Sequence, residues 1–307
     1  MSTLGLGCWA IGGPLRAGEA WESYGSVDDQ ESIRAIEVAL DLGITLFDTA
    51  DAYGAGHSEK ILGRALGARR KEAFIATKFG ALFDEQLRRL VGEMHETGHV
   101  RRACEASLRR LKTDYIDLYL FHLGDWPAER AGEVREALEQ LVSQGKIRSY
   151  GWSTDDPVRA RLFAEGKHCS AMEFELNALR DNPAMLSLCE EFSWTALARS
   201  PLAMGLLSGK YDYNASFGVG DLRGGTTEDW VTYFKDGKPE SEFLARSKAL
   251  RESLTQGGRT PVQGALAWLW ARHPQVVPIP GFKNEWQVRE FAQALRLGAR
   301  PLVQGLK

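Results

Sequence analysis

Cysteine is scarce in this sequence and follows no spacing pattern. The 307 residues include four cysteines, no two of them arranged as C-x-x-C: Cys8, Cys104, Cys169 and Cys189. Scattered cysteines of this kind predict neither a disulfide framework nor a cysteine metal cluster. We therefore expect a protein with reduced thiols and a cytoplasmic location.

Long apolar runs and an excess of positive charge are also missing. No window of about 18 uncharged apolar residues occurs, so we expect no membrane span. The N-terminus, MSTLGLGCWAIGG, lacks the basic segment and long apolar core of a signal peptide. The formal net charge of −3 argues against a nucleic-acid-binding surface and a polybasic membrane-binding face. The expected partner is a small molecule, and the composition leaves a monomer and a homo-oligomer both open.

Short apolar runs recur along the chain, each followed by a charged or amphipathic segment. Eight of these runs are strand candidates, at residues 4–12, 44–50, 73–79, 115–123, 149–154, 171–177, 194–200 and 276–281. They read as continuous apolar runs more than as alternating patterns. Such runs are typical of parallel strands that are covered on both faces.

The segments between the apolar runs carry helix signals. Residues 28–43 open on Asp28, have an apolar stripe, and close on Gly43. Residues 100–113 and 133–147 repeat this design. The eight-membered alternation of strand and helix predicts an α/β fold of the (β/α)8 TIM barrel type, in preference to an open doubly wound sheet.

No linker or shift in composition divides the chain, so we expect one domain over residues 1–307. One long irregular stretch, at about 211–239, lies between the seventh strand candidate and the next helix. A loop of that length inside a compact domain is usually functional or mobile.

Four polar side chains lie at or just beyond the ends of three successive strand candidates. Asp48 ends ITLFD and is followed by Tyr53 in a glycine-rich turn, Lys78 ends AFIATK, and His122 ends YIDLYLFH. In a barrel of this kind, side chains at the C-terminal ends of the strands carry the chemistry. Four groups of complementary chemistry at one edge indicate a catalytic site.

The segments around these residues resemble a known family. Six of them are similar, in order and over nearly the whole chain, to successive motifs of the aldo-keto reductase superfamily: GITLFDTADAYGAGHSEKILG, ATKFG, SLRRLKTDYIDLYLFH, GKIRSYGWST, ARSPLAMGLLSGKY and VVPIPGFKNEWQVRE. The resemblance is nearer to the bacterial and potassium-channel β-subunit-like branch. It implies a TIM barrel, an NADP(H) cofactor and a catalytic tetrad, formed here by Asp48, Tyr53, Lys78 and His122.

The chemistry of the four residues fits this implication. Reduction of a carbonyl by hydride leaves an alkoxide, so the site needs a proton donor within hydrogen-bond reach of the oxygen. We expect Tyr53 to be that donor, with Lys78 stabilising its phenolate. Asp48 would hold the ammonium of Lys78, and His122 would donate to the carbonyl oxygen. The predicted function is reduction of an aldehyde, ketone or sugar carbonyl to an alcohol, or the reverse reaction.

The cofactor is expected across the barrel mouth and not on a Rossmann fingerprint. GLGCWA at 5–10 matches G-x-G-x-x-[G/A], but the residues after it have no helical periodicity. The resemblance implies that Lys283 pairs with the adenosine 2′-phosphate and that residues 200–210 wrap the pyrophosphate. The full set of expected contacts to NADPH or NADP is Trp9, Ser153, Thr154, Glu173, Arg199, Ser200, Leu202, Gly205, Lys210, Gly281, Lys283, Asn284, Gln287 and Glu290.

Some of these positions depart from the pattern of the family. Thr154 and Glu173 stand where an asparagine and a glutamine usually hold the nicotinamide carboxamide beside a serine, here Ser153. Glutamate accepts but does not donate, so we expect the carboxamide to be held differently. Arg199 replaces an aromatic residue that stacks on the nicotinamide, and its guanidinium plane could stack instead. Phe291 replaces an asparagine on the adenine side.

The substrate is set by the loops of the barrel mouth, so the sequence names none. Six aromatic residues could line its pocket: Trp21, Tyr24, Phe79, Phe83, Trp126 and Trp230. We also expect the loop at 211–239 to fold over the bound dinucleotide, with Arg223 or Trp230 meeting the cofactor or the substrate.

A zinc-peptidase pattern, H-E-x-x-H, occurs at residues 95–99 as HETGH. Gly98 disfavours the helix that would bring the two histidines together, and no third ligand follows at a familiar spacing. We expect a solvated loop here and no metal site.

The alternative function is a cofactor-sensing regulatory or interaction subunit. The same resemblance extends to potassium-channel β subunits, which keep the tetrad, so the tetrad does not separate the two functions. The chain begins at its first predicted strand, which favours the enzyme. Consumption of NADPH with small carbonyls would separate them.

Overall fold

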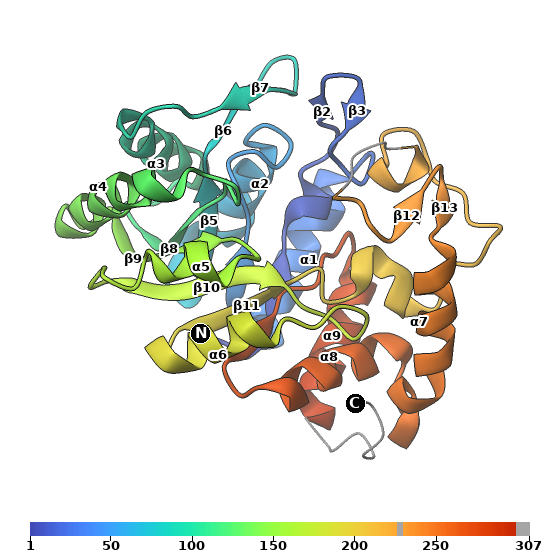
Figure 1. Cartoon of the computed structure of the whole chain (residues 1–307). Coiled ribbons are helices and arrows are strands. Elements are labelled where there is room, and N and C mark those ends of the chain that lie inside the picture. Colours follow the sequence, from blue (N-terminus) through green and yellow to red (C-terminus); the bar gives the residue numbers. More distant parts are fainter. Residues whose placement is uncertain (226–229, 299–307) are drawn as a thin grey trace.

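Eight parallel strands form one sheet in the computed structural model, which describes residues 1–225 and 230–298 (Figure 1). In hydrogen-bonded order they are β1 (Gly5–Gly7), β4 (Leu46–Asp48), β5 (Phe74–Phe79), β8 (Ile116–Phe121), β9 (Ile147–Ser153), β10 (Cys169–Glu175), β11 (Thr195–Arg199) and β14 (Val276–Pro278). Each overlaps one of the predicted runs, and most of their residues are buried. The prediction of eight parallel strands is confirmed.

The sheet closes on itself. Gly7, in the first strand, donates its N–H to the backbone oxygen of Pro280 at 2.9 Å and forms a parallel bridge with Gly281. A Cβ added at Gly7 would lie 2.8 Å from the backbone oxygen of Ile279, so only glycine allows this approach. The fold is therefore the predicted (β/α)8 barrel and not an open sheet.

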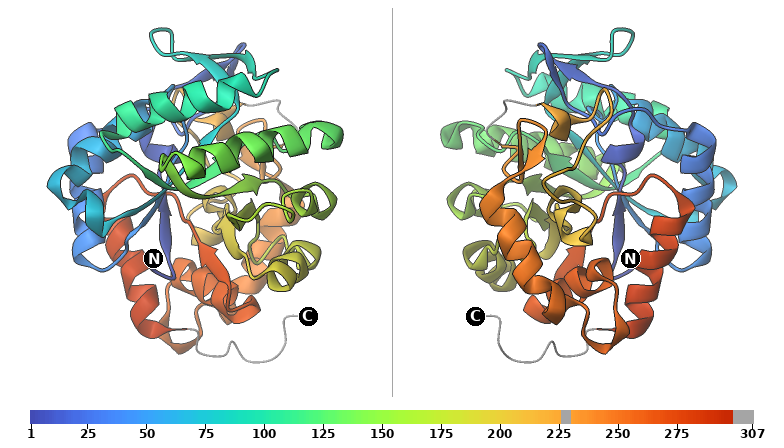
Figure 2. Two further views of the ribbon diagram at one scale, coloured as in Figure 1. Left: turned by 90° about the vertical axis from the view of Figure 1, so that its left-hand side faces the viewer. Right: turned by 90° about the vertical axis from the view of Figure 1, so that its right-hand side faces the viewer.

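Helices cover the outside of the strands (Figure 2). They are α1 (Asp29–Asp41), α2 (His57–Leu66), α3 (Gly98–Leu111), α4 (Ala131–Ser143), α5 (Pro157–Arg161), α6 (Pro183–Phe192), α7 (Ser241–Leu254), α8 (Pro261–Arg272) and α9 (Glu285–Leu297). The predicted start of the first is confirmed, because the Asp28 carboxylate accepts from the backbone N–H groups of Gln30 and Glu31. In the part of the chain that the structure describes, no helix is long and apolar enough to cross a membrane.

Short 3-10 helices complete the connections: η1 (Trp9–Ile11), η2 (Gly67–Glu72), η3 (Ala128–Arg130), η4 (Ala203–Ser208), η5 (Leu222–Gly224) and η6 (Gln256–Gly258). A second, four-stranded sheet lies beyond the ends of β1 and β5 and projects from the barrel (Figure 1). Its strands are β2 (Arg16–Ala17), β3 (Ala20–Trp21), β6 (Ala81–Asp84) and β7 (Arg89–Glu93). We did not predict it.

The stretch at 211–239 is more ordered than its composition indicates. It contains η5 and a small hairpin of β12 (Phe234–Lys235) and β13 (Lys238–Pro239). Leu222, Tyr233 and Phe234 are buried in an apolar cluster with Leu206 of η4. The predicted irregular stretch therefore includes short regular segments, which apolar side chains anchor. Residues 226–229 of this stretch lie outside the described residues, as do residues 299–307 of the predicted domain.

The HETGH segment is only partly the loop that we expected. His95 precedes α3, whereas Gly98 and His99 form its first turn. Gly98 therefore begins a helix instead of preventing one, and the two histidines do not share the helix. Among the residues that the structure describes, no group of three or more His, Cys, Asp or Glu side chains could hold a metal ion.

Candidate active site

A buried ion pair lies at the C-terminal ends of β4 and β5. Lys78 is fully buried, and its Nζ donates to the two carboxylate oxygens of Asp48 at 2.6 and 2.7 Å. The same Nζ donates to the backbone oxygen of Thr49 at 3.0 Å. A buried ammonium needs such partners, because desolvation of an unpaired charge is costly. The two strands are neighbours in register, Asp48 opposite Ala76, and this register brings the two side chains together.

Tyr53 and His122 complete the group. The phenol oxygen of Tyr53 lies 3.3 Å from Lys78 Nζ, and the His122 ring is edge-on to the Tyr53 ring with centroids 6.0 Å apart. The turn that carries Tyr53 is fixed by Gly54, whose φ is +60° and where an added Cβ would lie 1.8 Å from the backbone oxygen of Gly12. The structure therefore brings together the four side chains that the sequence predicts to be catalytic.

Burial governs the protonation of these groups. It raises the pKa of Asp48, with a further rise from Glu173 and an opposing effect from Lys78. Burial also raises the pKa of the Tyr53 phenol, and the Lys78 charge opposes this rise. Lys78 thus acts on the phenol in the expected direction, but desolvation outweighs it. Burial and the Lys78 charge lower the pKa of His122 to about 3, so its imidazole is neutral at pH 7.

A cavity of about 1260 Å³ opens at the C-terminal ends of the strands. Asp48, Tyr53 and His122 line it, whereas Lys78 does not reach its surface. All but one of the predicted cofactor contacts also line it: Trp9, Ser153, Thr154, Glu173, Arg199, Ser200, Leu202, Gly205, Lys210, Gly281, Lys283, Gln287 and Glu290. The exception is Asn284.

Comparison with known proteins assigns the chain to a family. The family model described as "Aldo/keto reductase family" matches residues 3–300. The chain belongs to the aldo/keto reductase family. The resemblance stated from the motifs is thereby confirmed, and we classify the chain as an oxidoreductase.

Relatives of this aldo/keto reductase include a fission-yeast protein and two solved structures. The aldo-keto reductase yakc of Schizosaccharomyces pombe, whose name specifies NADP(+), is 32% identical over 286 residues, 89% of this chain and 80% of that protein. The glycerol dehydrogenase AKR11B4 from Gluconobacter oxydans is 30% identical with a TM-score of 0.78, over 96% of this chain and 86% of that one. An aldo/keto reductase from Klebsiella pneumoniae, solved with NADP and acetate, is 28% identical with a TM-score of 0.63, over 98% and 93%.

Helix capping organises the segment around Lys283 that the sequence predicts to contact the cofactor. Asn284 is the N-cap of α9 and accepts from the backbone N–H of Gln287 at 3.0 Å, while the Gln287 side chain accepts from the N–H of Lys283 at 2.7 Å. Lys283 Nζ donates to the backbone oxygens of Tyr24 and Ser26 at 2.5 and 3.3 Å. The side-chain oxygen of Asn284 thus accepts within the helix, and Asn284 does not line the cavity.

Two of the positions that depart from the family pattern contact other residues of the barrel. Glu173, which we expected to meet the nicotinamide carboxamide, lies with Oε2 3.3 Å from Lys78 Nζ and accepts from the Ser153 hydroxyl at 3.3 Å. Thr154 donates to the backbone oxygen of Gly124 at 3.3 Å. Strands β5 and β10 are not neighbours in the barrel, so Glu173 approaches Lys78 across the barrel interior.

Arg199, the third of these positions, forms an ion pair with Asp155. Asp155 also accepts from the backbone N–H of Glu175 at 2.6 Å and lines the cavity. We did not predict Asp155 or Trp286, which also lines the cavity. Asp155 directly follows the motif GKIRSYGWST and Trp286 lies within VVPIPGFKNEWQVRE, so a position in or beside a motif was the available signal.

The aromatic wall of the cavity is smaller than predicted. Of the six aromatic residues proposed, Tyr24 and Trp230 line the cavity, and both contact Trp9, with ring centroids 5.0 and 5.8 Å from its own. Phe79 instead stacks on Tyr119 in the core at 4.6 Å. Trp126 is also buried in the core, and Trp21 and Phe83 are not lining residues.

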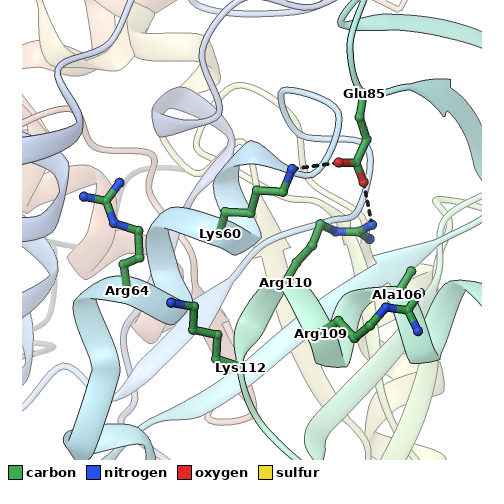
Figure 3. A pocket seen from close by; sticks show the side chains of 7 residues that line it. All are labelled: Lys60, Arg64, Glu85, Ala106, Arg109, Arg110 and Lys112. Atoms are coloured by element: carbon green, nitrogen blue, oxygen red, sulfur yellow. Dashed lines mark hydrogen bonds and ion pairs between the residues drawn. The ribbon is translucent and has the colours of Figure 1, made fainter.

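A second hollow, of about 490 Å³, lies on the outside of the barrel and is rich in positive charge (Figure 3). Its lining residues come from α2, from the region of α3 and from the turn after β6: Lys60, Arg64, Glu85, Ala106, Arg109, Arg110 and Lys112. Glu85 accepts from Lys60 at 2.7 Å and from Arg110 at 3.1 Å. None of the predicted catalytic or cofactor residues lines this hollow.

Proposed function

We propose that this aldo/keto reductase is an NADP(H)-dependent oxidoreductase that reduces an aldehyde, ketone or sugar carbonyl to an alcohol, or catalyses the reverse, with Tyr53 as general acid and base. The observation that carries the proposal is the contact between the Tyr53 phenol and the buried Lys78–Asp48 pair beside the large cavity. The NADP named for the fission-yeast relative and bound in the Klebsiella structure supports the choice of cofactor.

The residues around the cavity fit a phosphorylated dinucleotide. Ser200, Ala203 and Met204 have positive φ values of 50°, 48° and 54°, an unusual run for residues other than glycine. Such strain collects where backbone groups face a ligand, in agreement with a pyrophosphate at this turn. Lys210 and Lys283 supply cations at the cavity for the phosphates.

The side chain of Glu173 also fits a bound nicotinamide carboxamide. Its Oε2 is buried and accepts no hydrogen bond from any residue that the structure describes. The Lys78 ammonium lies 3.3 Å from this oxygen, and the amide N–H of a nicotinamide carboxamide would add the hydrogen-bond donor that it lacks. Ser153, Thr154 and Glu173 would hold the carboxamide, and Lys283 would hold the 2′-phosphate.

Bound NADPH would supply the hydride. Tyr53 would give its proton to the oxygen that becomes the alcohol. Lys78 would stabilise the phenolate that remains, and Asp48 would keep Lys78 charged in a site where a lone ammonium is costly. His122, neutral at pH 7, would donate an N–H to the carbonyl oxygen and orient it. In the reverse direction Tyr53 must first lose its proton, so alkaline pH would favour alcohol oxidation.

The substrate-facing side of the cavity is aromatic. Trp9 lies nearly parallel to Tyr53, with centroids 5.8 Å apart, and it also contacts Tyr24 and Trp230. An aromatic wall beside the proton donor would bury an apolar face of the carbonyl compound while its oxygen reaches Tyr53 and His122.

The test is oxidation of NADPH, followed by its absorbance, with a panel of small aldehydes, ketones and sugars. We expect turnover with at least one of them and none in the Tyr53→Phe variant under the same conditions. Tight binding of NADPH without turnover of any carbonyl would instead support the cofactor-sensing subunit. Absence of NADP(H) binding would contradict both functions.

A further inference from the structure

Two carboxyl groups share one ammonium inside the barrel. Asp48, Glu173 and Lys78 are 3%, 2% and 0% exposed. Lys78 Nζ lies 2.6 Å from an Asp48 oxygen and 3.3 Å from Glu173 Oε2. If both carboxyls were ionised, this buried group would carry a net charge of −1. The ordinary arrangement for one buried lysine needs a single carboxylate, so the second carboxyl requires an explanation.

Within the described part of the chain, no second cation forms an ion pair with Asp48 or Glu173. Among the residues that the structure describes, Lys78 is the cation that forms an ion pair with Asp48 and with Glu173. Arg199 on β11 is near enough to be influenced by Glu173, but its own ion pair is with Asp155. Two carboxylates that share a desolvated site repel each other, and one of them then keeps a proton.

Other titratable groups lie close to the pair, including Asp51 after β4, a further buried carboxyl whose pKa burial raises and the Lys78 charge lowers. Burial raises the pKa of Cys8, after β1, and of Tyr53, after β4, so both are neutral near pH 7. His122, after β8, is also neutral. On β10 itself, Glu175 is bound by Tyr233 at 2.6 Å and by Arg180 at 2.8 Å.

We propose that Asp48 and Glu173 hold one proton between them and release it when the oxidised nicotinamide ring binds, so that pH sets the relative affinity for NADP+ and NADPH. This inference rests on the proposed function, because it requires a nicotinamide cofactor in the cavity that both carboxyls line. The released proton passes to water through this cavity. Glu173 is then a specificity-determining residue that acts on the choice between oxidised and reduced cofactor.

The sign of the effect follows from charge. The oxidised nicotinamide ring is a cation, and a nearby cation favours the ionised form of a carboxyl. Binding of NADP+ therefore releases the proton, and its affinity rises with pH. The reduced ring is neutral and lacks this attraction, while the carboxamide is common to both cofactors, so NADPH binding releases less of the proton than NADP+ binding does. Because both cofactors carry the same 2′-phosphate, the ionisation of that phosphate cancels in the ratio of their dissociation constants.

The test is the ratio of the dissociation constants of NADPH and NADP+, measured by quenching of tryptophan fluorescence of the full chain from about pH 6 to about pH 9. We expect the ratio to rise with pH, by up to about tenfold per unit at its steepest, which corresponds to one proton. Glu173→Gln keeps the shape of the side chain and removes the shared proton, so its ratio should change less than about twofold over the range. A ratio in Glu173→Gln as steep as in the wild type would overturn the proposal.

Glu175→Gln is the matched control. It makes the same change on the same strand, at a carboxylate held by Tyr233 and Arg180, and should keep the wild-type pH dependence. Calorimetry of the wild type in buffers of different ionisation enthalpy gives a readout independent of any variant. It should show more protons released with NADP+ than with NADPH, and equal numbers would overturn the proposal.

The outcomes also separate this inference from the proposed function. Binding of both cofactors with a ratio independent of pH would overturn the shared proton and leave the oxidoreductase function standing. Failure of both cofactors to bind at any pH would overturn the proposed function, and the inference with it.

Discussion

Replacing Lys78 by methionine should destabilise the protein in a way that depends on pH. Lys78 is fully buried and donates to Asp48 at 2.6 and 2.7 Å, and it is the cation nearest to Glu173. Methionine fills a similar volume without charge, so the variant leaves two buried carboxyls without their ammonium. Removal of one partner of a buried ion pair typically costs ~3–5 kcal/mol.

This loss of unfolding free energy can be measured by thermal unfolding or by urea unfolding. For 307 residues the entropy of unfolding is about 0.6 kcal/mol/K, so a loss of ~3–5 kcal/mol lowers Tm by roughly 5–8 °C. Burial already raises the folded-state pKa of Asp48, and loss of the Lys78 charge raises it further. The folded state then binds more protons than the unfolded one, so the variant regains stability as pH falls. The penalty should be larger at about pH 7 than at about pH 5.

Urea unfolding of the wild type and of Lys78→Met at both pH values checks this prediction. Lys60→Met is the matched control, because Lys60 pairs with Glu85 on the surface and its side chain is 47% exposed (Figure 3). The control should lose no more than ~1 kcal/mol at either pH. A penalty for Lys78→Met as small as that of the control, or one that grows as pH falls, would refute the account of the buried pair.

Two further predictions concern the cofactor. Lys283→Met should weaken NADPH binding far more than NADH binding, because only NADPH carries the 2′-phosphate proposed to contact Lys283. Equal losses of affinity for both cofactors in a binding titration would show that Lys283 does not contact this phosphate. Saturating NADPH should slow amide hydrogen exchange around Arg223 and Trp230, which line the cavity from the 211–239 stretch. Exchange that is unchanged at both residues would show that this stretch does not cover the cofactor.

The barrel itself could be predicted because its signals are local. Each strand overlaps a run of mainly apolar residues, and α1 begins directly after Asp28, whose carboxylate caps it as the sequence indicates. The small sheet beside the barrel could not be predicted in the same way. Two of its strands have two residues each, and β2 pairs with β7 more than 70 residues further along the chain, Arg16 opposite Arg89. Non-local pairing of such short strands leaves no periodic pattern in the sequence.

The residues of the site differ in the same way, since local signals locate some of them and others depend on contacts between distant parts of the chain. Asp48, Lys78 and His122 could be located because each stands at or just after the end of its own strand, and strand ends meet at the barrel mouth. The contact between Lys78 and Glu173 spans strands that are not adjacent, so it depends on the closure of the barrel. Asn284 was assigned to the cofactor from its motif, but its oxygen caps α9. Asparagine serves both purposes, and the sequence alone does not separate them.

The most direct test of the central claim is hydride transfer in a single turnover, at saturating NADPH and with a carbonyl that the wild type reduces. Tyr53→Phe removes only the hydroxyl that lies 3.3 Å from Lys78 Nζ. We predict that this variant binds NADPH as the wild type does and transfers hydride at least ~10²-fold more slowly, the scale of a lost general acid. A rate near that of the wild type would contradict the assignment of Tyr53 as the proton donor.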